Sequence, residues 1–186
     1  MAESAKSYRL LSSEEIHVLL EEFLVKYPYF VKLTTAQEAF GLPSAGSAYD
    51  CPWDERNGCP NAILTIQDYI QHPDGSESSN TLPEVFWSGC VHGNERVGPT
   101  VVMETASLLL EAATCEWLLR SGSANDICRA TLAESGIDDI QRQWLARLVS
   151  TRRIVIVPTG NVMILIDGIV HFCLHLESLN KSCFIH

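Results

Sequence analysis

Two residues with metal-ligand chemistry, His92 and Glu95, lie three positions apart in a short stretch between two strongly apolar segments. An imidazole nitrogen and a carboxylate oxygen are both suitable zinc ligands. Gly93 lets the backbone turn tightly enough for both side chains to reach one ion, and Gly98 would permit close approach between the turn and a sheet. The spacing H-x-x-E is common on its own, so its meaning depends on the elements that position it.

The segments on either side of this turn predict a strand followed by a helix. Residues 84–91 (EVFWSGCV) form a β-rich, almost continuously apolar run, typical of a central strand buried on both faces. Residues 101–119 are apolar and rich in good helix formers, and Pro99 sits at a position where a helix can begin. Sites in open α/β sheets form at the carboxyl ends of strands, which is where this turn is expected.

The rest of the chain predicts alternating helices and strands. Ser12 and Glu15 have the spacing of a capping box, and apolar residues at helical spacing follow as far as Pro28. A second amphipathic helix is expected over residues 138–149, and strands over 30–35, 62–70 and 153–158. This order predicts an α/β fold with a mixed, mostly parallel sheet flanked by helices. Residues 1–161 are expected to form one domain, and 162–186 an atypical apolar tail.

Charge and composition exclude several partners. With 13 Lys and Arg against 23 Asp and Glu, the formal net charge of the 186 residues is -10. Such a surface repels phosphate backbones and anionic lipids, so nucleic acid and membrane partners are not expected. The N-terminus has no apolar signal-peptide core, and the apolar run at 162–176 is too short to span a bilayer. These features predict a cytoplasmic protein.

The seven cysteines lack the spacing of a disulfide framework or a structural zinc site. The favoured interpretation is a set of buried or free thiols in a reducing compartment. Cys51 and Cys59, which flank a loop of Pro, Gly and Asn, form the pair best placed to bridge.

The stretch from Cys90 to Gly98 (CVHGNERVG), followed by an aliphatic helix, resembles the zinc-binding turn of the zinc metallocarboxypeptidases. It is most similar to the branch that reads H-G-N-E-x-V-G. The similarity extends upstream to a helix that ends in Tyr27 and Pro28, and downstream to the R-I-x-x-x-P-x-x-N pattern that ends at Asn161. It covers roughly residues 8–161, so the fold it implies is an incomplete zinc carboxypeptidase domain.

This resemblance implies a zinc-dependent hydrolase that cleaves the C-terminal residues of peptides or proteins. In the family a zinc ion polarises the scissile carbonyl and a bound water, and a distant glutamate acts as general base. His92 and Glu95 match the first two zinc ligands, while no residue matches the base or the groups that bind the substrate's carboxylate. The same H-G-N-E turn occurs in relatives of aspartoacylase and succinylglutamate desuccinylase, so a zinc deacylase is an alternative.

The tail departs from the family pattern. After Asn161 the family has a Pro-Asp-Gly turn, an Asn-Arg pair, a third ligand histidine and a late glutamate, none of which is recognisable in residues 162–186. His171 and His175 are four apart and could share a helix face, but isolated histidines in apolar runs are more often packing residues. A truncated, catalytically silent chain that acts as a binding or regulatory fragment is therefore a third hypothesis.

Overall fold

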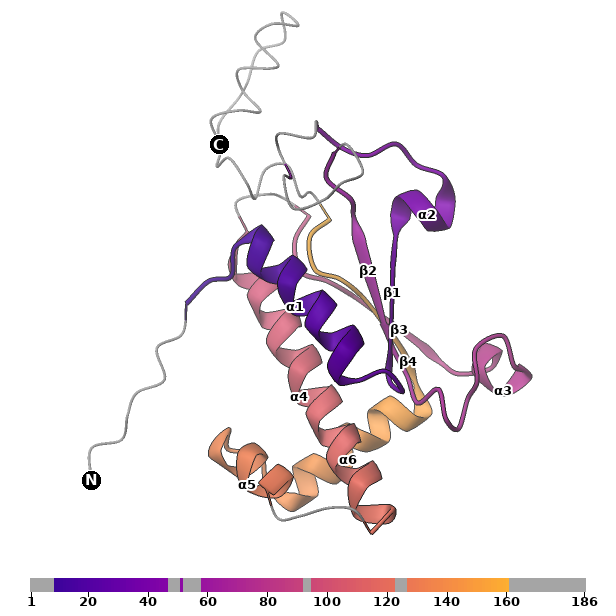
Figure 1. Ribbon diagram of the computed structural model, residues 1–186, viewed down its shortest axis with the longest axis vertical. Coiled ribbons are helices and arrows are strands. Elements are labelled where there is room, and N and C mark those ends of the chain that lie inside the picture. The colour runs from indigo at the N-terminus through magenta and orange to yellow at the C-terminus, as the bar shows by residue number, and fades with distance from the viewer. Residues whose placement is uncertain (1–8, 47–50, 52–57, 92–94, 123–126, 161–186) are drawn as a thin grey trace, which may run out of the picture.

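The computed structural model describes residues 9–46, 51, 58–91, 95–122 and 127–160 (Figure 1). Helices and a four-stranded sheet make up an α/β fold. The elements are, in chain order, α1 (Ser13–Lys26), β1 (Val31–Thr35), α2 (Ala36–Phe40), β2 (Ala62–Ile66), α3 (Glu77–Asn80), β3 (Glu84–Ser88), α4 (Val97–Arg120), α5 (Ile127–Glu134), α6 (Asp139–Thr151) and β4 (Arg153–Val157).

The sheet has the order β1-β2-β4-β3 and is mixed, as the sequence predicts. The prediction of a mostly parallel sheet is wrong, because β1 pairs with β2 and β2 with β4 in antiparallel fashion, and within the described sheet β3 and β4 alone are parallel. A parallel pair needs a long crossover connection. Between β3 and β4 the chain forms α4, α5 and α6, which supply that crossover, whereas the connection from β1 to β2 includes only the five-residue helix α2 among the described residues.

The helices bury one face of the sheet. Figure 1 shows α1 and α4 side by side over it, and the core joins Leu20 of α1 and Leu109 of α4 to Leu64 and Ile156 of the sheet. On the opposite face of β3, Phe86 keeps 63% of its surface exposed. The strand therefore alternates exposed and half-buried residues, and the prediction that it is buried on both faces is wrong. The composition did not reveal that only one face of β3 is buried, because aromatic and β-branched residues occupy both of its faces.

Two helix starts follow directly from the sequence. Ser12 Oγ accepts a hydrogen bond from the Glu15 amide at 3.2 Å, and Glu15 Oε2 accepts one from the Ser12 amide at 2.8 Å. The predicted capping box is therefore confirmed. Asp138 caps α6 in the same way, with its Oδ1 accepting from the Gln141 amide at 2.8 Å. Reciprocal bonds of this kind satisfy backbone donors that a helix start otherwise leaves without partners.

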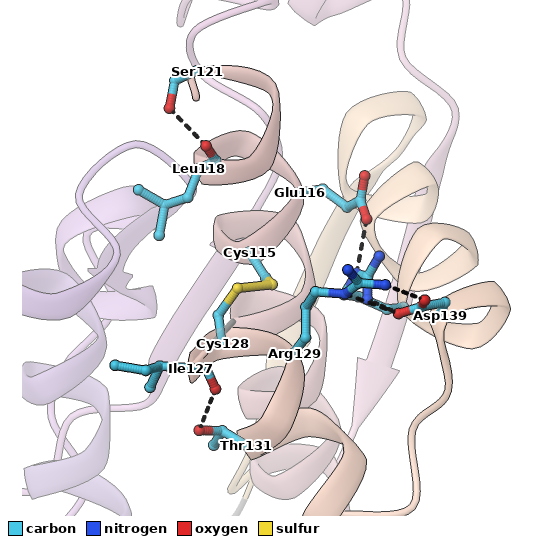
Figure 2. Close-up of a disulfide and its surroundings, with 10 residues drawn as sticks. Cys115, Glu116, Leu118, Ser121, Ile127, Cys128, Arg129, Thr131 and Asp139 are labelled. Carbon is cyan, nitrogen blue, oxygen red and sulfur yellow. Dashed lines mark hydrogen bonds and ion pairs between the residues drawn. A yellow bond between two sulfur atoms is a disulfide. The ribbon is translucent and has the colours of Figure 1, made fainter. Parts of the chain in front are cut away.

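Among the residues that the structure describes, two disulfides join cysteines close in sequence. Cys51 bonds to Cys59, the pair judged best placed to bridge, and Cys115 bonds to Cys128. The second bond, drawn in Figure 2, links the last turns of α4 to the start of α5. The interpretation of the cysteines as a set of thiols is thus wrong for these four. Cys115 and Cys128 lie on different helices, and only the fold brings their sulfurs together.

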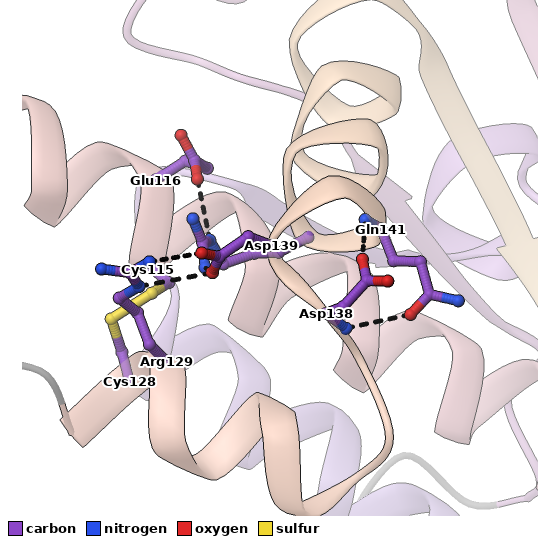
Figure 3. A network of polar contacts seen from close by, with 8 residues as sticks. Cys115, Glu116, Cys128, Arg129, Asp138, Asp139 and Gln141 are labelled. Atoms are coloured by element: carbon purple, nitrogen blue, oxygen red, sulfur yellow. Dashed lines mark hydrogen bonds and ion pairs between the residues drawn. A yellow bond between two sulfur atoms is a disulfide. The ribbon is translucent and has the colours of Figure 1, made fainter.

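A buried arginine ties α6 to α4. Arg142 is only 4% exposed, and its Nε donates to Glu116 Oε1 of α4 at 2.8 Å. It also pairs with Asp139, which Arg129 of α5 reaches through its own Nε at 3.3 Å (Figure 3). Hydrogen bonds from Arg129 and then Arg142 hold the pKa of the Asp139 carboxyl below its ordinary value. Three helices therefore meet in one polar network beside the Cys115–Cys128 disulfide.

In the parts of the chain that the structure describes, no helix is both long enough and apolar enough to cross a membrane.

Candidate metal centre

Glu95 stands at the junction of the turn and α4. Its side chain is exposed, and its Oε2 accepts a hydrogen bond from the Val91 amide at 3.1 Å. This bond ties the carboxylate back to the residue that leads out of the strand. His92 and Gly93, the other residues predicted to shape the site, lie outside the described residues. The structure thus places one of the two predicted ligands.

Val91 and Glu95, the described residues that flank the turn, are joined by a hydrogen bond beyond the carboxyl end of β3. Beyond β3, the Gly89 amide donates to Val157 O at 2.9 Å, and the Gly160 amide donates to Cys90 O at 3.1 Å. The parallel pairing therefore continues past the ends of both strands and up to the turn. In Figure 1 this end of the sheet is also the end at which α4 begins. A crevice at such a point is the usual place for a site in an α/β sheet.

Glycines allow the helix, the turn and the sheet to touch through their backbones. A Cβ on Gly98 would lie 1.7 Å from Gly89 O, and a Cβ on Gly89 would lie 2.1 Å from Pro158 O. A Cβ on Gly160 would lie 2.8 Å from Cys90 O. The expectation that Gly98 permits close approach is confirmed. Sequence reasoning missed Gly89 and Gly160, although a glycine at a strand end is itself a signal of close backbone approach.

Asn61 supports the β4 side of the site. Its Nδ2 donates to Gly160 O at 3.0 Å and to Thr159 O at 3.4 Å. Gln37 of α2 holds Asn61 in turn, since Gln37 Oε1 accepts from the Asn61 amide at 3.0 Å. These bonds fix the chain where it leaves β4 beside the turn. Nothing in the local sequence around Asn61 marks it for this role, because its partners are about 100 residues away.

The start of α4 adds a favourable field for an anion. The N-cap residue Arg96 has helical backbone angles and makes no side-chain capping bond. Backbone N–H groups of a first helical turn have no partner within the helix, and together with the macrodipole they favour negative charge. Glu95, directly before this turn, is therefore in a position that suits a carboxylate.

Of the predicted zinc ligands, Glu95 is the one that the structure describes, and its surroundings suit a metal ligand. Ligating carboxylates are commonly oriented by a second hydrogen bond, and the Val91 amide supplies one to Glu95. Among the described residues, no three His, Cys, Asp or Glu side chains gather closely enough to hold a metal. Since His92, His171 and His175 lie outside those residues, the predicted ligand set is not tested by that finding.

No protein-family model matches the chain, and no curated protein matches it either. The assignment of a function therefore depends on the residues of the turn and on the geometry that surrounds it.

Proposed function

We propose that this chain carries the zinc-binding part of a metallocarboxypeptidase-type hydrolase, with His92 and Glu95 as two of the metal ligands. The observation that carries the proposal is the placement of Glu95. Its carboxylate is oriented by the Val91 amide, next to the start of α4 and the carboxyl ends of β3 and β4. Its substrates would be the C-termini of peptides or proteins.

The roles of the described residues follow from this placement. Zinc, when bound, would polarise a carbonyl and a water molecule. Glu95 would contribute one oxygen ligand, and the Val91 amide would hold the carboxylate in its ligating orientation. The contacts at Gly89 and Gly98 would keep the turn rigid against the sheet, which a metal site requires for fixed ligand geometry.

Zinc binding and hydrolysis are separate parts of the proposal. The family mechanism also needs a third ligand, a general base and a clamp for the substrate carboxylate. None of these can be assigned to a described residue by the resemblance. Metal binding is therefore the part of the proposal that can be measured directly on this chain.

The test is isothermal titration calorimetry with zinc chloride on the intact oxidised chain. Glu95→Gln removes one ligand charge, and we expect it to weaken zinc binding at least about tenfold, as His92→Ala should. Glu104→Gln is the matched control, because Glu104 is exposed on α4, the helix that follows Glu95, and the substitution removes the same charge. Equal affinities of Glu95→Gln and Glu104→Gln would sink the proposal.

A substrate comparison separates the hydrolase classes. The zinc-loaded chain is incubated with a peptide that has a free C-terminus and with an N-acyl amino acid, and the released amino acid is measured. Release from the peptide supports a carboxypeptidase, and release from the acyl compound supports the deacylase. Tight zinc binding without release from either substrate would favour the non-catalytic fragment.

We also propose that the chain folds in an oxidising compartment. The bonds Cys51–Cys59 and Cys115–Cys128 support this, because disulfides rarely persist in the reducing cytoplasm. Mass spectrometry of peptides from protein isolated with its thiols blocked is the test. Both linked peptides should be recovered, and recovery of the four cysteines in blocked form would overturn the proposal.

A further inference from the structure

A cavity of about 190 Å³ lies at the other end of α4, away from the turn. Its walls come from the end of α1, the second half of α4, and α5, and they include the Cys115–Cys128 disulfide and Leu132. One ordered water needs roughly 10–15 Å³ of such space, so the cavity is large enough for a small organic molecule. Glu111, on its wall, is 16 positions after Glu95, which is about 24 Å along the helix.

Two buried hydroxyl groups on the cavity wall point to a ligand. Tyr27 is 3% exposed, and its phenolic oxygen, which lies near Lys26 and Glu111, has no well-aligned hydrogen-bond partner among the described residues. The buried Oγ1 of Thr114 also has no partner there. Burying a hydroxyl without a hydrogen bond is costly, and native proteins seldom leave such groups unsatisfied. Both residues line the same cavity, so one molecule could satisfy both groups.

The charges on the cavity wall select for a molecule without net charge. Lys26 Nζ and Glu111 Oε1 lie 3.5 Å apart, and both residues line the cavity. An anion would be attracted by Lys26 and repelled by Glu111, and a cation the reverse. A zwitterion avoids both penalties, because its carboxylate can face Lys26 while its ammonium faces Glu111. The Lys26 side chain is 62% exposed, so this ion pair can open at little cost to admit such groups.

The remaining wall is apolar. Leu132 is 1% exposed, and the Cys115–Cys128 disulfide lies beside it on the cavity wall. A hydrocarbon group placed against these atoms would be removed from water, which is favourable in proportion to the apolar area that it buries. The cavity volume limits this group to a short side chain.

We propose that this cavity binds a free amino acid with a short aliphatic side chain. The carboxylate and ammonium would face Lys26 and Glu111, the Tyr27 and Thr114 hydroxyls would hydrogen-bond the polar end, and the side chain would lie against Leu132. The assignment is independent of the zinc proposal, because it uses no residue of the turn.

The test is calorimetric titration of the intact chain with L-valine and L-leucine, in the presence of EDTA so that no metal contributes. Saturable binding is expected. Isovalerate and isoamylamine each lack one charge of leucine, and isoamyl alcohol lacks both, so each should bind at least about tenfold more weakly. The proposal would be overturned if neither amino acid bound saturably, or if isoamyl alcohol bound as tightly as L-leucine.

Two conservative variants locate the binding site. Tyr27→Phe and Thr114→Val remove only a hydroxyl or replace it with a methyl group, and each should weaken L-leucine binding about two- to tenfold. Tyr29→Phe is the matched control, because Tyr29 is 51% exposed and does not line the cavity. Thermal melts confirm that the variants fold. Unchanged binding in both cavity variants would also overturn the proposal, since binding would then occur elsewhere.

Discussion

Replacing Gly98 with alanine tests whether the turn, the sheet and α4 depend on direct backbone contact. The added Cβ would lie 1.7 Å from Gly89 O, whereas real Cβ atoms essentially never come closer than 3.0 Å to another heavy atom. The two backbones would have to separate by roughly 1 Å or more, and neither has a flexible end that can move aside. Overpacking usually costs about 1–3 kcal/mol, and contact between two backbones places this case at the upper end.

Helix propensity alone predicts that Gly98→Ala stabilises the protein. Gly98 is in the first turn of α4, and alanine in a helix interior is favoured over glycine by roughly 0.5–1 kcal/mol. We expect the clash to outweigh this gain, so that Gly98→Ala lowers the free energy of unfolding by about 2–2.5 kcal/mol. That is a large share of the roughly 5–15 kcal/mol by which proteins are stable.

Urea denaturation followed by circular dichroism measures this change. Gly122→Ala is the control at the other end of α4, where φ is +72° and no atom lies within 4 Å of the added Cβ. It should cost only about 1–2 kcal/mol, from the left-handed backbone conformation alone. A Gly98→Ala variant as stable as the wild type, or more stable, would refute the close-contact account of the site.

Three further predictions concern the far end of α4. Reducing the Cys115–Cys128 bond, or replacing both cysteines with serine, should lower the free energy of unfolding by about 3 kcal/mol, because the bond closes a loop with a sequence separation of 13. Thermal melts with and without reductant measure this change. Arg142→Met should cost about 3 kcal/mol or more by urea denaturation, since it leaves the largely buried Glu116 carboxylate without the Arg142 cation. A change below about 1 kcal/mol would contradict this. The lowered pKa of Asp139 contributes stability that is fully present above the ordinary pKa of 3.8 and is lost as the pH falls through the pKa in the folded protein. Asp139→Asn should therefore flatten the dependence of the free energy of unfolding on pH in this acid range. An unchanged slope would show that the pairing with Arg129 and Arg142 contributes nothing.

Local signals in the sequence predicted much of the fold. The capping box at Ser12 and Glu15 and the helix that begins after Asp138 depend on residues within one turn of each other, so their spacing is sufficient. The close approach at Gly98 was also predictable from its place between a strand and a helix. Short-range rules such as these do not depend on the arrangement of the sheet.

Features that depend on long-range pairing could not be predicted in the same way. Alternating strands and helices suggested a mostly parallel sheet, but the direction of each pair depends on which strands become neighbours, and β4 inserts between β2 and β3. The disulfide between Cys115 and Cys128 depends on how α5 folds back on α4. At the candidate site, the sequence shows that Glu95 carries a carboxylate, a group that suits a metal, whereas its bond to Val91 and the bonds of Asn61 depend on the fold.

The central claim is that Glu95, beside the carboxyl ends of β3 and β4, binds zinc together with His92. The most direct measurement is anomalous diffraction at the zinc edge from crystals of the zinc-loaded chain. The account predicts an anomalous peak at the start of α4, with a His92 nitrogen and a Glu95 oxygen each about 2.0–2.2 Å from the ion. A zinc ion bound elsewhere, with the Glu95 carboxylate not coordinated to it, would contradict this claim.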